Sequence, residues 1–278
     1  MIPYQYALRR RMMLQEIVKL PPAGRGFANY TWAELDAISR AGLAAEYFTV
    51  GETRSIDLSY VSDGVDYSGT YNLAIHDINH DDLADGSGKA GLTIGFNTVF
   101  TKYNVLHPAN RTDVFWGNCD MRTTYLPEYF SILPADLQAV IKTVNKIYLT
   151  QTDLPNTADN IANYQRVVQD KLFLPSSHEF LKTTTGLFLW EGTQYPYLAT
   201  EENRIKYDVS GAAQLWWTRT MYSSFINEEY GQIGNYVNEY GTTISSGDGT
   251  AAFISNPSRE NSLTKTTSYR CAAPLFCI

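Results

Sequence analysis

The chain has 278 residues, of which 44% are hydrophobic and 13% aromatic, so it can bury a sizeable core. Its formal net charge of -7 and pI of about 5.1 disfavour a polyanionic partner, and we expect no nucleic-acid binding. It lacks any uncharged apolar run of about 18 residues, so we expect neither membrane insertion nor a Sec signal peptide.

The N-terminal segment is predicted to be a helical arm. Residues 4–19 follow Pro3, which favours a helix start, and precede the helix-breaking stretch PPAGRG at 21–26. The arginines at 9–11 suit contact with an acidic neighbour, the alternative being a solvated charge run with frayed ends. We interpret residues 1–26 as an attachment arm that contacts other virion or tail subunits, and we expect a homo-oligomer.

The next elements are predicted to be a helix and a hairpin. TWAE, beginning at Thr31, is a capping box, and Gly42 is placed to end the helix that follows. SIDLSY and TYNLAIH alternate in polarity around the turn signal SDGVDYSG, which predicts paired antiparallel strands. GLTIGFNTV is typical of a further strand.

An acidic cluster follows in HDINHDDLADGSGKAG. Neither Asp77 nor Asp81 as first ligand gives the glycine and distal carboxylate that an EF-hand needs. Turns shaped by Asp and Gly are the favoured interpretation. We therefore expect no metal or other cofactor, and the remaining candidates for a calcium site of another type are Asp77, Asp81, Asp82 and Asp85.

Catalytic motifs are incomplete in this chain. His76 and His80 have the H-x-x-x-H spacing of zinc proteases but lack the adjacent glutamate, and GSGKAG at 86–91 lacks the phosphate-loop spacing. The three cysteines are odd in number and contain no C-x-x-C pair, so we interpret them as buried apolar side chains. We expect no enzyme, and a hydrolase without a recognisable motif is a further alternative.

The second half is predicted to contain short helices at PEYFSIL, PADLQAVI and SSHEFLK, where Ser176 and Glu179 form a second capping box. KLFL, QLWWTR and the terminal CAAPLFCI are predicted to be buried strands. Helices and strands are intermixed without a repeat, which favours one α+β domain over residues 27–278.

The segment between Met221 and Tyr269 is rich in Tyr, Ser, Asn and Gly. Antibody binding loops use this mixture because tyrosine offers a large contact area at low entropic cost, while small polar residues supply adaptable hydrogen bonds. Ordinary polar surface loops are the alternative. We expect loops between Thr218 and Tyr269 to bind a ligand, with these contact residues: Tyr222, Asn227, Tyr230, Asn235, Tyr236, Asn238 and Tyr240.

Several blocks carry a resemblance to a known family. NHDDLADGSGKAG, MRTTYLPEYFSILPADLQAVIKTVNK, DKLFLPSSHEF, NRIKY, WWTRT and APLFCI, in this order from about Trp32 to Ile278, closely resemble unknown-function family 6273 of gut bacteria and their phages. The ending also resembles C-type-lectin-like domains, a group that includes formylglycine-generating enzymes and diversified retroelement targets. The resemblance implies an α+β fold with short twisted antiparallel sheets, flanking helices and long loops.

The resemblance also implies roles for single residues. Trp216, Trp217 and Arg219 would belong to the central core motif, and Pro274 with Phe276 to the closing strand. A buried Arg219 needs a carboxylate or several carbonyl partners. Thr220 stands where Ser is usual, and Cys271 and Ala273 stand where Gly and Arg are common.

The enzymatic branch of the resemblance needs a copper-binding cysteine pair. Cys271 and Cys277 are six residues apart on one expected strand, which places them about 20 Å apart on one face, so that activity does not transfer.

These observations predict a non-catalytic ligand-binding protein of a phage or mobile element, displayed on a virion or extracellular surface. Its ligand would be a host-surface glycan or protein. The alternative is a structural virion component whose loops pack against neighbouring subunits. If the tail is diversified, the encoding locus should carry an imperfect copy that differs mainly at adenines, with a nearby reverse transcriptase.

Overall fold

The computed structural model describes residues 20–62, 64–104, 106, 115–150, 163–180, 191–223, 232–237, 240, 243–244, 252–253 and 270–278. The helix expected at residues 4–19 lies outside these ranges. The described residues form a mixed α/β structure with small antiparallel sheets and short helices, which confirms the α+β prediction.

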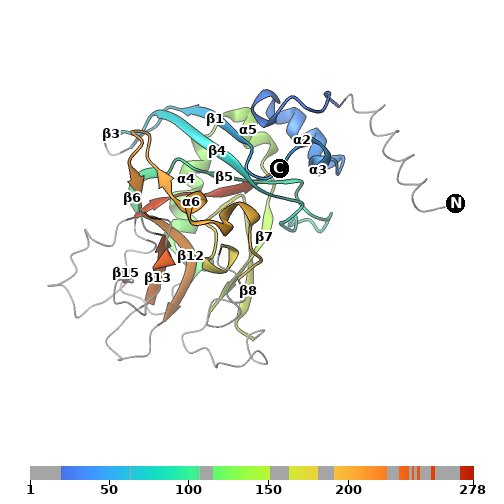
Figure 1. Ribbon diagram of the computed structural model, residues 1–278. Coiled ribbons are helices and arrows are strands. Elements are labelled where there is room, and N and C mark those ends of the chain that lie inside the picture. Colours follow the sequence, from blue (N-terminus) through green and yellow to red (C-terminus); the bar gives the residue numbers. More distant parts are fainter. Residues whose placement is uncertain are drawn as a thin grey trace.

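The first of two larger sheets has five strands in the order β1-β4-β5-β17-β9 (Figure 1). Each of its pairings is antiparallel. The strand bounds are β1 Thr53–Leu58, β4 Gly69–Ile78, β5 Leu92–Phe96, β17 Leu275–Cys277 and β9 Leu172–Phe173.

The predicted hairpin is formed by β1 and β4, which pair from Thr53↔Ala74 to Leu58↔Gly69. Its connection carries a smaller hairpin, β2 Val61–Ser62 with β3 Val65–Asp66. The expected strand GLTIGFNTV contains β5, whose five residues are all buried, as suits a strand covered on both faces. These sequence predictions are confirmed.

The second larger sheet has the order β14-β13-β12-β16-β6, and β15 also pairs with β13. Its long strand β12 is bound by β13 on one side and, in parallel, by β16 on the other. The bounds are β6 Phe100–Asn104, β12 Trp216–Ser223, β13 Gln232–Val237, β14 Thr243–Ile244, β15 Ala252–Phe253 and β16 Arg270–Ala272.

The expected single C-terminal strand is wrong, because the chain forms two strands that belong to different sheets. Cys271, in β16, pairs with Trp216, whereas Phe276, in β17, pairs with Ile94 and Leu172. Pro274 lies between them, and a proline lacks the N–H that an uninterrupted ladder requires. The C-terminal segment therefore joins the two larger sheets.

The helices are short and lie around the sheets (Figure 1). In α2, Thr31 Oγ1 accepts from Glu34 N at 3.2 Å and Glu34 Oε2 accepts from Thr31 N at 2.7 Å, so the predicted capping box is confirmed. Gly42 follows with φ 70°, a conformation that favours glycine after a helix end. The bounds are η1 Phe27–Asn29, α2 Trp32–Arg40, α3 Ala44–Tyr47, η2 Trp116–Asn118, η3 Met121–Tyr125, α4 Leu126–Ser131, α5 Ala135–Val140, η5 Ser177–Glu179, η6 Pro196–Ala199 and α6 Glu201–Arg204.

Two further hairpins extend the structure: β7 Val144–Leu149 with β8 Gln165–Asp170, and β10 Lys206–Tyr207 with β11 Ala213–Gln214. In Figure 1 the β7–β8 ribbon points away from the first sheet, and the C-terminus lies beside α2. Ser39 of α2 donates to the terminal carbonyl of Ile278 at 2.8 Å, and Trp32 packs edge-on against Phe276. No helix of the described part is long and apolar enough to cross a membrane.

Candidate functional site

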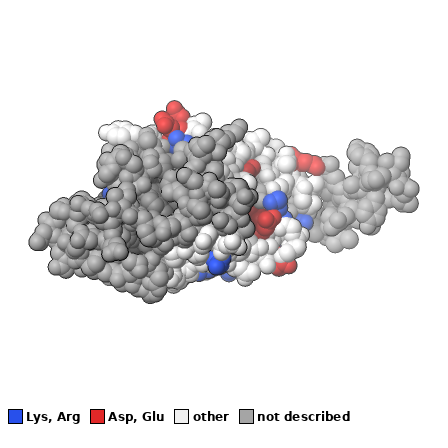
Figure 2. Space-filling view, turned by 90° about the horizontal axis from the view of Figure 1, so that it is seen from below, with Lys and Arg blue, Asp and Glu red and all other residues white. Residues whose placement is uncertain are grey.

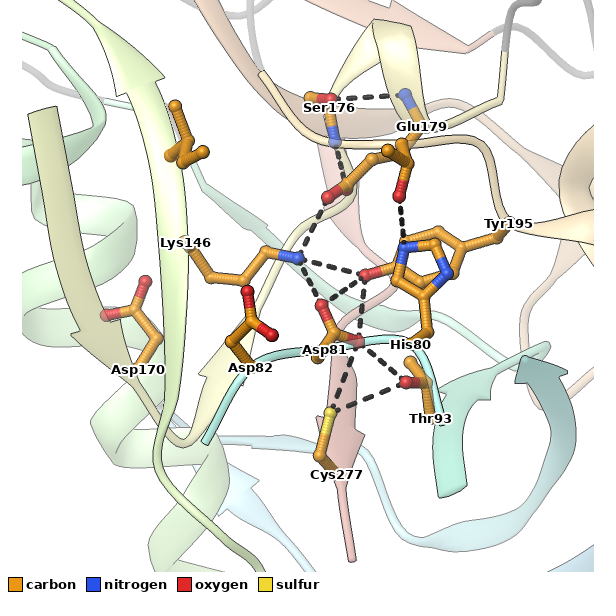
Figure 3. Close-up of polar contacts among 12 residues, drawn as sticks. His80, Asp81, Asp82, Thr93, Lys146, Asp170, Ser176, Glu179, Tyr195 and Cys277 are labelled. Atoms are coloured by element: carbon orange, nitrogen blue, oxygen red, sulfur yellow. Dashed lines mark hydrogen bonds and ion pairs between the residues drawn. The ribbon is translucent and has the colours of Figure 1, made fainter. Parts of the chain in front are cut away.

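A network of buried charges lies between the two larger sheets and β7 (Figure 3). Lys146 Nζ, from β7, donates to Asp81 Oδ1 at 2.7 Å, to Glu179 Oε1 at 2.8 Å and to Tyr195 Oη at 2.9 Å. Thr93, on β5, donates to Asp81 Oδ2 at 2.6 Å. Segments far apart in the sequence are thereby joined at one buried point.

Arg219, on β12, extends this network. Its guanidinium donates to both Glu179 oxygens, Nη1 to Oε2 at 2.5 Å and Nη2 to Oε1 at 2.8 Å. The backbone oxygens of Leu174 and Glu191 accept from the same group. Arg219 is fully buried, as are Trp216 and Trp217, and its carboxylate partner is Glu179. The bidentate geometry makes this the strongest ion pair of the network.

The charges of the network balance: two carboxylates, Asp81 and Glu179, face two cations, Lys146 and Arg219. Burial alone would raise the pKa of Glu179, but the nearby cations outweigh burial and lower it. Likewise, burial would raise the pKa of Asp81, but Lys146 and the Thr93 hydroxyl lower it far below its usual value. Both carboxylates are therefore ionised in the folded protein at neutral pH.

Glu179 also closes the second capping box, which the sequence predicted. Ser176 Oγ accepts from Glu179 N at 3.2 Å, and Glu179 Oε2 accepts from Ser176 N at 2.9 Å. The predicted helix at SSHEFLK is a single 3-10 turn, and residues 181–190 lie outside the described part. One carboxylate therefore both caps η5 and binds the buried cations.

A third buried carboxyl group, that of Glu191, lies beside the network, and no Lys or Arg of the described residues forms an ion pair with it. Its oxygens accept from Thr220 Oγ1 at 2.5 Å and from Leu149 N at 3.2 Å. Burial raises the pKa of Glu191 to about 7, although Arg219 and Thr220 oppose the shift. Glu191 therefore changes charge near neutral pH inside the protein.

The predicted ligand-binding residues fall partly on strands instead of loops. Tyr222 belongs to β12, and Asn235 and Tyr236 to β13, so the expectation of loops from Thr218 onward is wrong for these two strands. Tyr240 is 70% exposed. The other three predicted contacts lie outside the described residues: Asn227, Tyr230 and Asn238.

Strands β12 and β16 are neighbours, although they are far apart in the sequence. Trp216, the first residue of β12, pairs with Cys271 of β16, and Cys271 N donates to the Leu215 carbonyl at 3.0 Å. The first residue of β12 and the middle residue of β16 are thus held side by side in the second larger sheet. On the face shown in Figure 2, red and blue atoms are scattered among white ones, and the described residues form no extended basic patch there.

The four aspartates of the candidate calcium site have separate partners. Asp81 is in the buried network, Asp77 contacts His80, Asp82 pairs with Lys89 at 3.0 Å, and Asp85 accepts from Ser87. The described residues contain no group of three or more His, Cys, Asp and Glu arranged to hold a metal ion. Turn geometry accounts for Asp85, whereas Asp81 has a core role that the sequence did not indicate.

His80 links two side chains at the surface. Its Nδ1 lies 2.5 Å from Asp77 Oδ2, and its Nε2 lies 2.9 Å from Thr193 Oγ1. The His80 ring packs against Tyr195, with ring centroids 4.3 Å apart, and this contact places it at the edge of the buried network (Figure 3). The intervening Asn79 has φ 55°, a conformation that is uncommon for a residue other than glycine.

A second buried region contains His76 and Lys206. The His76 ring stacks on Tyr197 at 4.7 Å, and neither of its nitrogens has a hydrogen-bond partner among the described residues. Lys206 Nζ donates to Asn97 Oδ1 at 2.6 Å. Burial lowers the pKa of Lys206 to about 7. The buried position of Lys206 therefore favours its neutral amine over the charged ammonium.

All three cysteines are free and buried. Burial raises the pKa of Cys119 and of Cys271 to about 12, which makes both thiols unreactive. Because Cys271 and Cys277 lie on strands of different sheets, the spacing expected for one continuous strand is wrong. Cys277 Sγ contacts Asp81 at 3.4 Å within the buried network.

Comparison with known protein families gives a match over most of the second part of the chain. Residues 96–275, more than half of the chain, match a domain of unknown function, DUF6273. The chain belongs to the DUF6273 family. No curated protein matches the chain, and no solved structure does. The DUF6273 match begins within β5 and ends in β17, so it includes Lys146, Glu179 and Arg219 but not Asp81.

Sequence reasoning missed most of the buried network of this DUF6273 chain. Lys146, Tyr195 and Glu191 were not singled out, and Glu179 was recognised only as a cap. The sequence indicated only that a buried Arg219 would need a carboxylate or several carbonyl partners. Many carboxylates could have served, and choosing Glu179 required the fold.

Proposed function

We propose that this chain is a ligand-binding protein of a phage or mobile element that contacts a host-surface glycan or protein through residues 221–269. Binding at this surface needs no chemical step. The observation that carries the proposal is the composition of that segment, in which tyrosines alternate with Ser, Asn and Gly. We further propose a C-type-lectin-like fold, a virion or extracellular location and an origin in gut bacteria or their phages.

The way the segment is attached supports the proposal. β12 enters it directly after Arg219, whose guanidinium is bound by Glu179 and by backbone oxygens. The following Thr220 is held by Glu191, and β16 brings the chain back beside Trp216. A binding surface works best on rigid elements, because less conformational freedom is then lost on binding.

The attachment arm belongs to the same proposal, since residues 1–26 would contact other virion or tail subunits or further copies of the chain. Tyr30 Oη donates to the Pro22 carbonyl at 2.7 Å, and Tyr47 Oη donates to the Pro21 carbonyl at 2.9 Å. These bonds fix residues 21 and 22 on the body. A deletion that tests the arm should therefore remove residues 1–19 only.

The test replaces Tyr222, Tyr230, Tyr236 and Tyr240 with alanine and measures binding of the labelled protein to a panel of fixed gut-bacterial cells. We expect binding by the original protein to be lost in the quadruple variant. Tyr207→Ala is the matched control, because Tyr207 is 45% exposed and lies on β10, outside the segment. Unchanged binding by a folded quadruple variant refutes the assignment, as does an original protein that binds no cell of the panel.

A further inference from the structure

We propose that Thr193, His80 and Asp77 form a catalytic triad that hydrolyses carboxylic esters, with Thr193 as nucleophile, His80 as general base and Asp77 as the carboxylate that orients the imidazole. The two hydrogen bonds run in series: Thr193 Oγ1 to His80 Nε2 at 2.9 Å, and His80 Nδ1 to Asp77 Oδ2 at 2.5 Å. This is the order in which serine hydrolases arrange a hydroxyl, an imidazole and a carboxylate. The activity is separate from ligand binding by residues 221–269.

The proposed mechanism uses the neutral imidazole of His80. In that form we place the proton on Nδ1, where the Asp77 carboxylate accepts its hydrogen bond, which leaves a lone pair on Nε2. That lone pair is then the acceptor for the hydroxyl hydrogen of Thr193. Thr193 is exposed, whereas the side chains of His80 and Asp77 are only 12% and 18% exposed. The hydroxyl thus faces solvent while its base is shielded.

The surrounding chain holds this geometry. Glu191, two residues before Thr193, is anchored by Thr220, and Tyr195, two residues after it, donates from its backbone N–H to the Glu179 carbonyl at 2.7 Å. Gly192 has φ 120°, and a Cβ there would lie 2.5 Å from Glu179 Oε1. The hydroxyl therefore sits on a short loop that is fixed on both sides by the buried network.

The reaction balances without a cofactor. Thr193 Oγ1 attacks the ester carbonyl carbon while His80 Nε2 takes the hydroxyl proton; the C–O bond to the alcohol then breaks, and the alcohol leaves with that proton. Water attacks the acyl-threonine in the same way, returning the acid product and the free hydroxyl. The Thr193 and Gln194 N–H groups donate to no described residue, and we assign them to the developing oxyanion. An exposed nucleophile suits an ester carried on a polymer or cell surface.

The test uses the full chain and p-nitrophenyl acetate. We expect Thr193→Ala and His80→Gln to lower kcat/KM by roughly a hundredfold or more, which is the rate enhancement that a positioned catalytic side chain usually provides. Asp77→Asn should lower kcat with KM little changed, because an asparagine NH₂ at Nδ1 moves the imidazole proton to Nε2. Thr193→Ser keeps the hydroxyl and should retain activity, and Thr200→Ala alters another exposed threonine and should have no effect.

Mass spectrometry of acid-quenched protein gives a second readout. An acetyl group on the peptide that contains Thr193, present in the original protein and absent from His80→Gln, supports the proposal. Hydrolysis by Thr193→Ala at the original rate, or an original protein no faster than His80→Gln, overturns it. Thermal unfolding of each variant shows whether a loss of activity reflects loss of the fold.

Discussion

Replacing Glu179 with glutamine should destabilise the protein strongly. The carboxylate is buried and binds two cations, Arg219 at 2.5 Å and Lys146 at 2.8 Å. Glutamine has the same shape but no charge, so Arg219 and Lys146 would be left with Asp81 and with Glu191, whose pKa of about 7 leaves it partly protonated at neutral pH. Removing one partner of a buried ion pair costs about 3–5 kcal/mol. At roughly 2–4 °C per kcal/mol for a large domain, Tm should fall by about 10 °C.

The assay is urea unfolding at pH 7, followed by tryptophan fluorescence. Glu34→Gln is the matched control, because the Arg25–Glu34 pair is 38% and 29% exposed and glutamine can still close the capping box. Glu34→Gln should lower the free energy of unfolding by less than about 1 kcal/mol. Adding Lys146→Met to Glu179→Gln restores charge balance, so the double variant should lose less stability than the two single variants summed. Equal losses of stability for Glu179→Gln and Glu34→Gln would show that the buried ion pairs of Glu179 do not stabilise the fold.

Three further predictions concern buried titratable groups. Lys206 has a pKa of about 7 in the folded protein against an ordinary value of 10.5, so its effect makes the protein more stable as pH increases from 7 to 10.5. Urea unfolding should show that Lys206→Met is more stable than the original protein at pH 6, and that this difference is smaller at pH 10. Glu191 has a pKa of about 7 in the folded protein against an ordinary value of 4.5, so its contribution to the free energy of unfolding is fully present below pH 4.5 and is lost as pH rises through 7. In the Glu191→Gln variant, the free energy of unfolding should therefore change less between pH 4.5 and 7 than in the original protein. Cys119, Cys271 and Cys277 should resist iodoacetamide in the native protein and react in urea, as counted by mass spectrometry, and rapid native labelling would contradict their burial.

Local signals in the sequence predicted much of the secondary structure. The capping boxes at Thr31 and Ser176 were found because their partners lie three residues apart. The β1–β4 hairpin was found because alternation and turn residues act over a short range. The C-terminal segment was misread as one strand because a proline between apolar runs did not indicate that the two halves join different sheets.

The candidate sites depend on contacts between residues far apart in the sequence. Asp81 was placed in a turn cluster by its neighbours, yet it pairs with Lys146, sixty-five residues away. Likewise, His80 and Thr193 are separated by 113 residues and carry no linear motif. Such pairings arise when sheets pack, so a motif search that reads neighbouring residues does not detect them.

Hydrogen–deuterium exchange in the presence of a cell-envelope preparation from a bound bacterium tests the central claim most directly. We expect slower exchange within residues 221–269 and little change in the first sheet, whose amides are already hydrogen-bonded between strands. Protection confined to residues 1–26, or no protection anywhere despite binding, would contradict the claim that the segment after Arg219 is the binding surface.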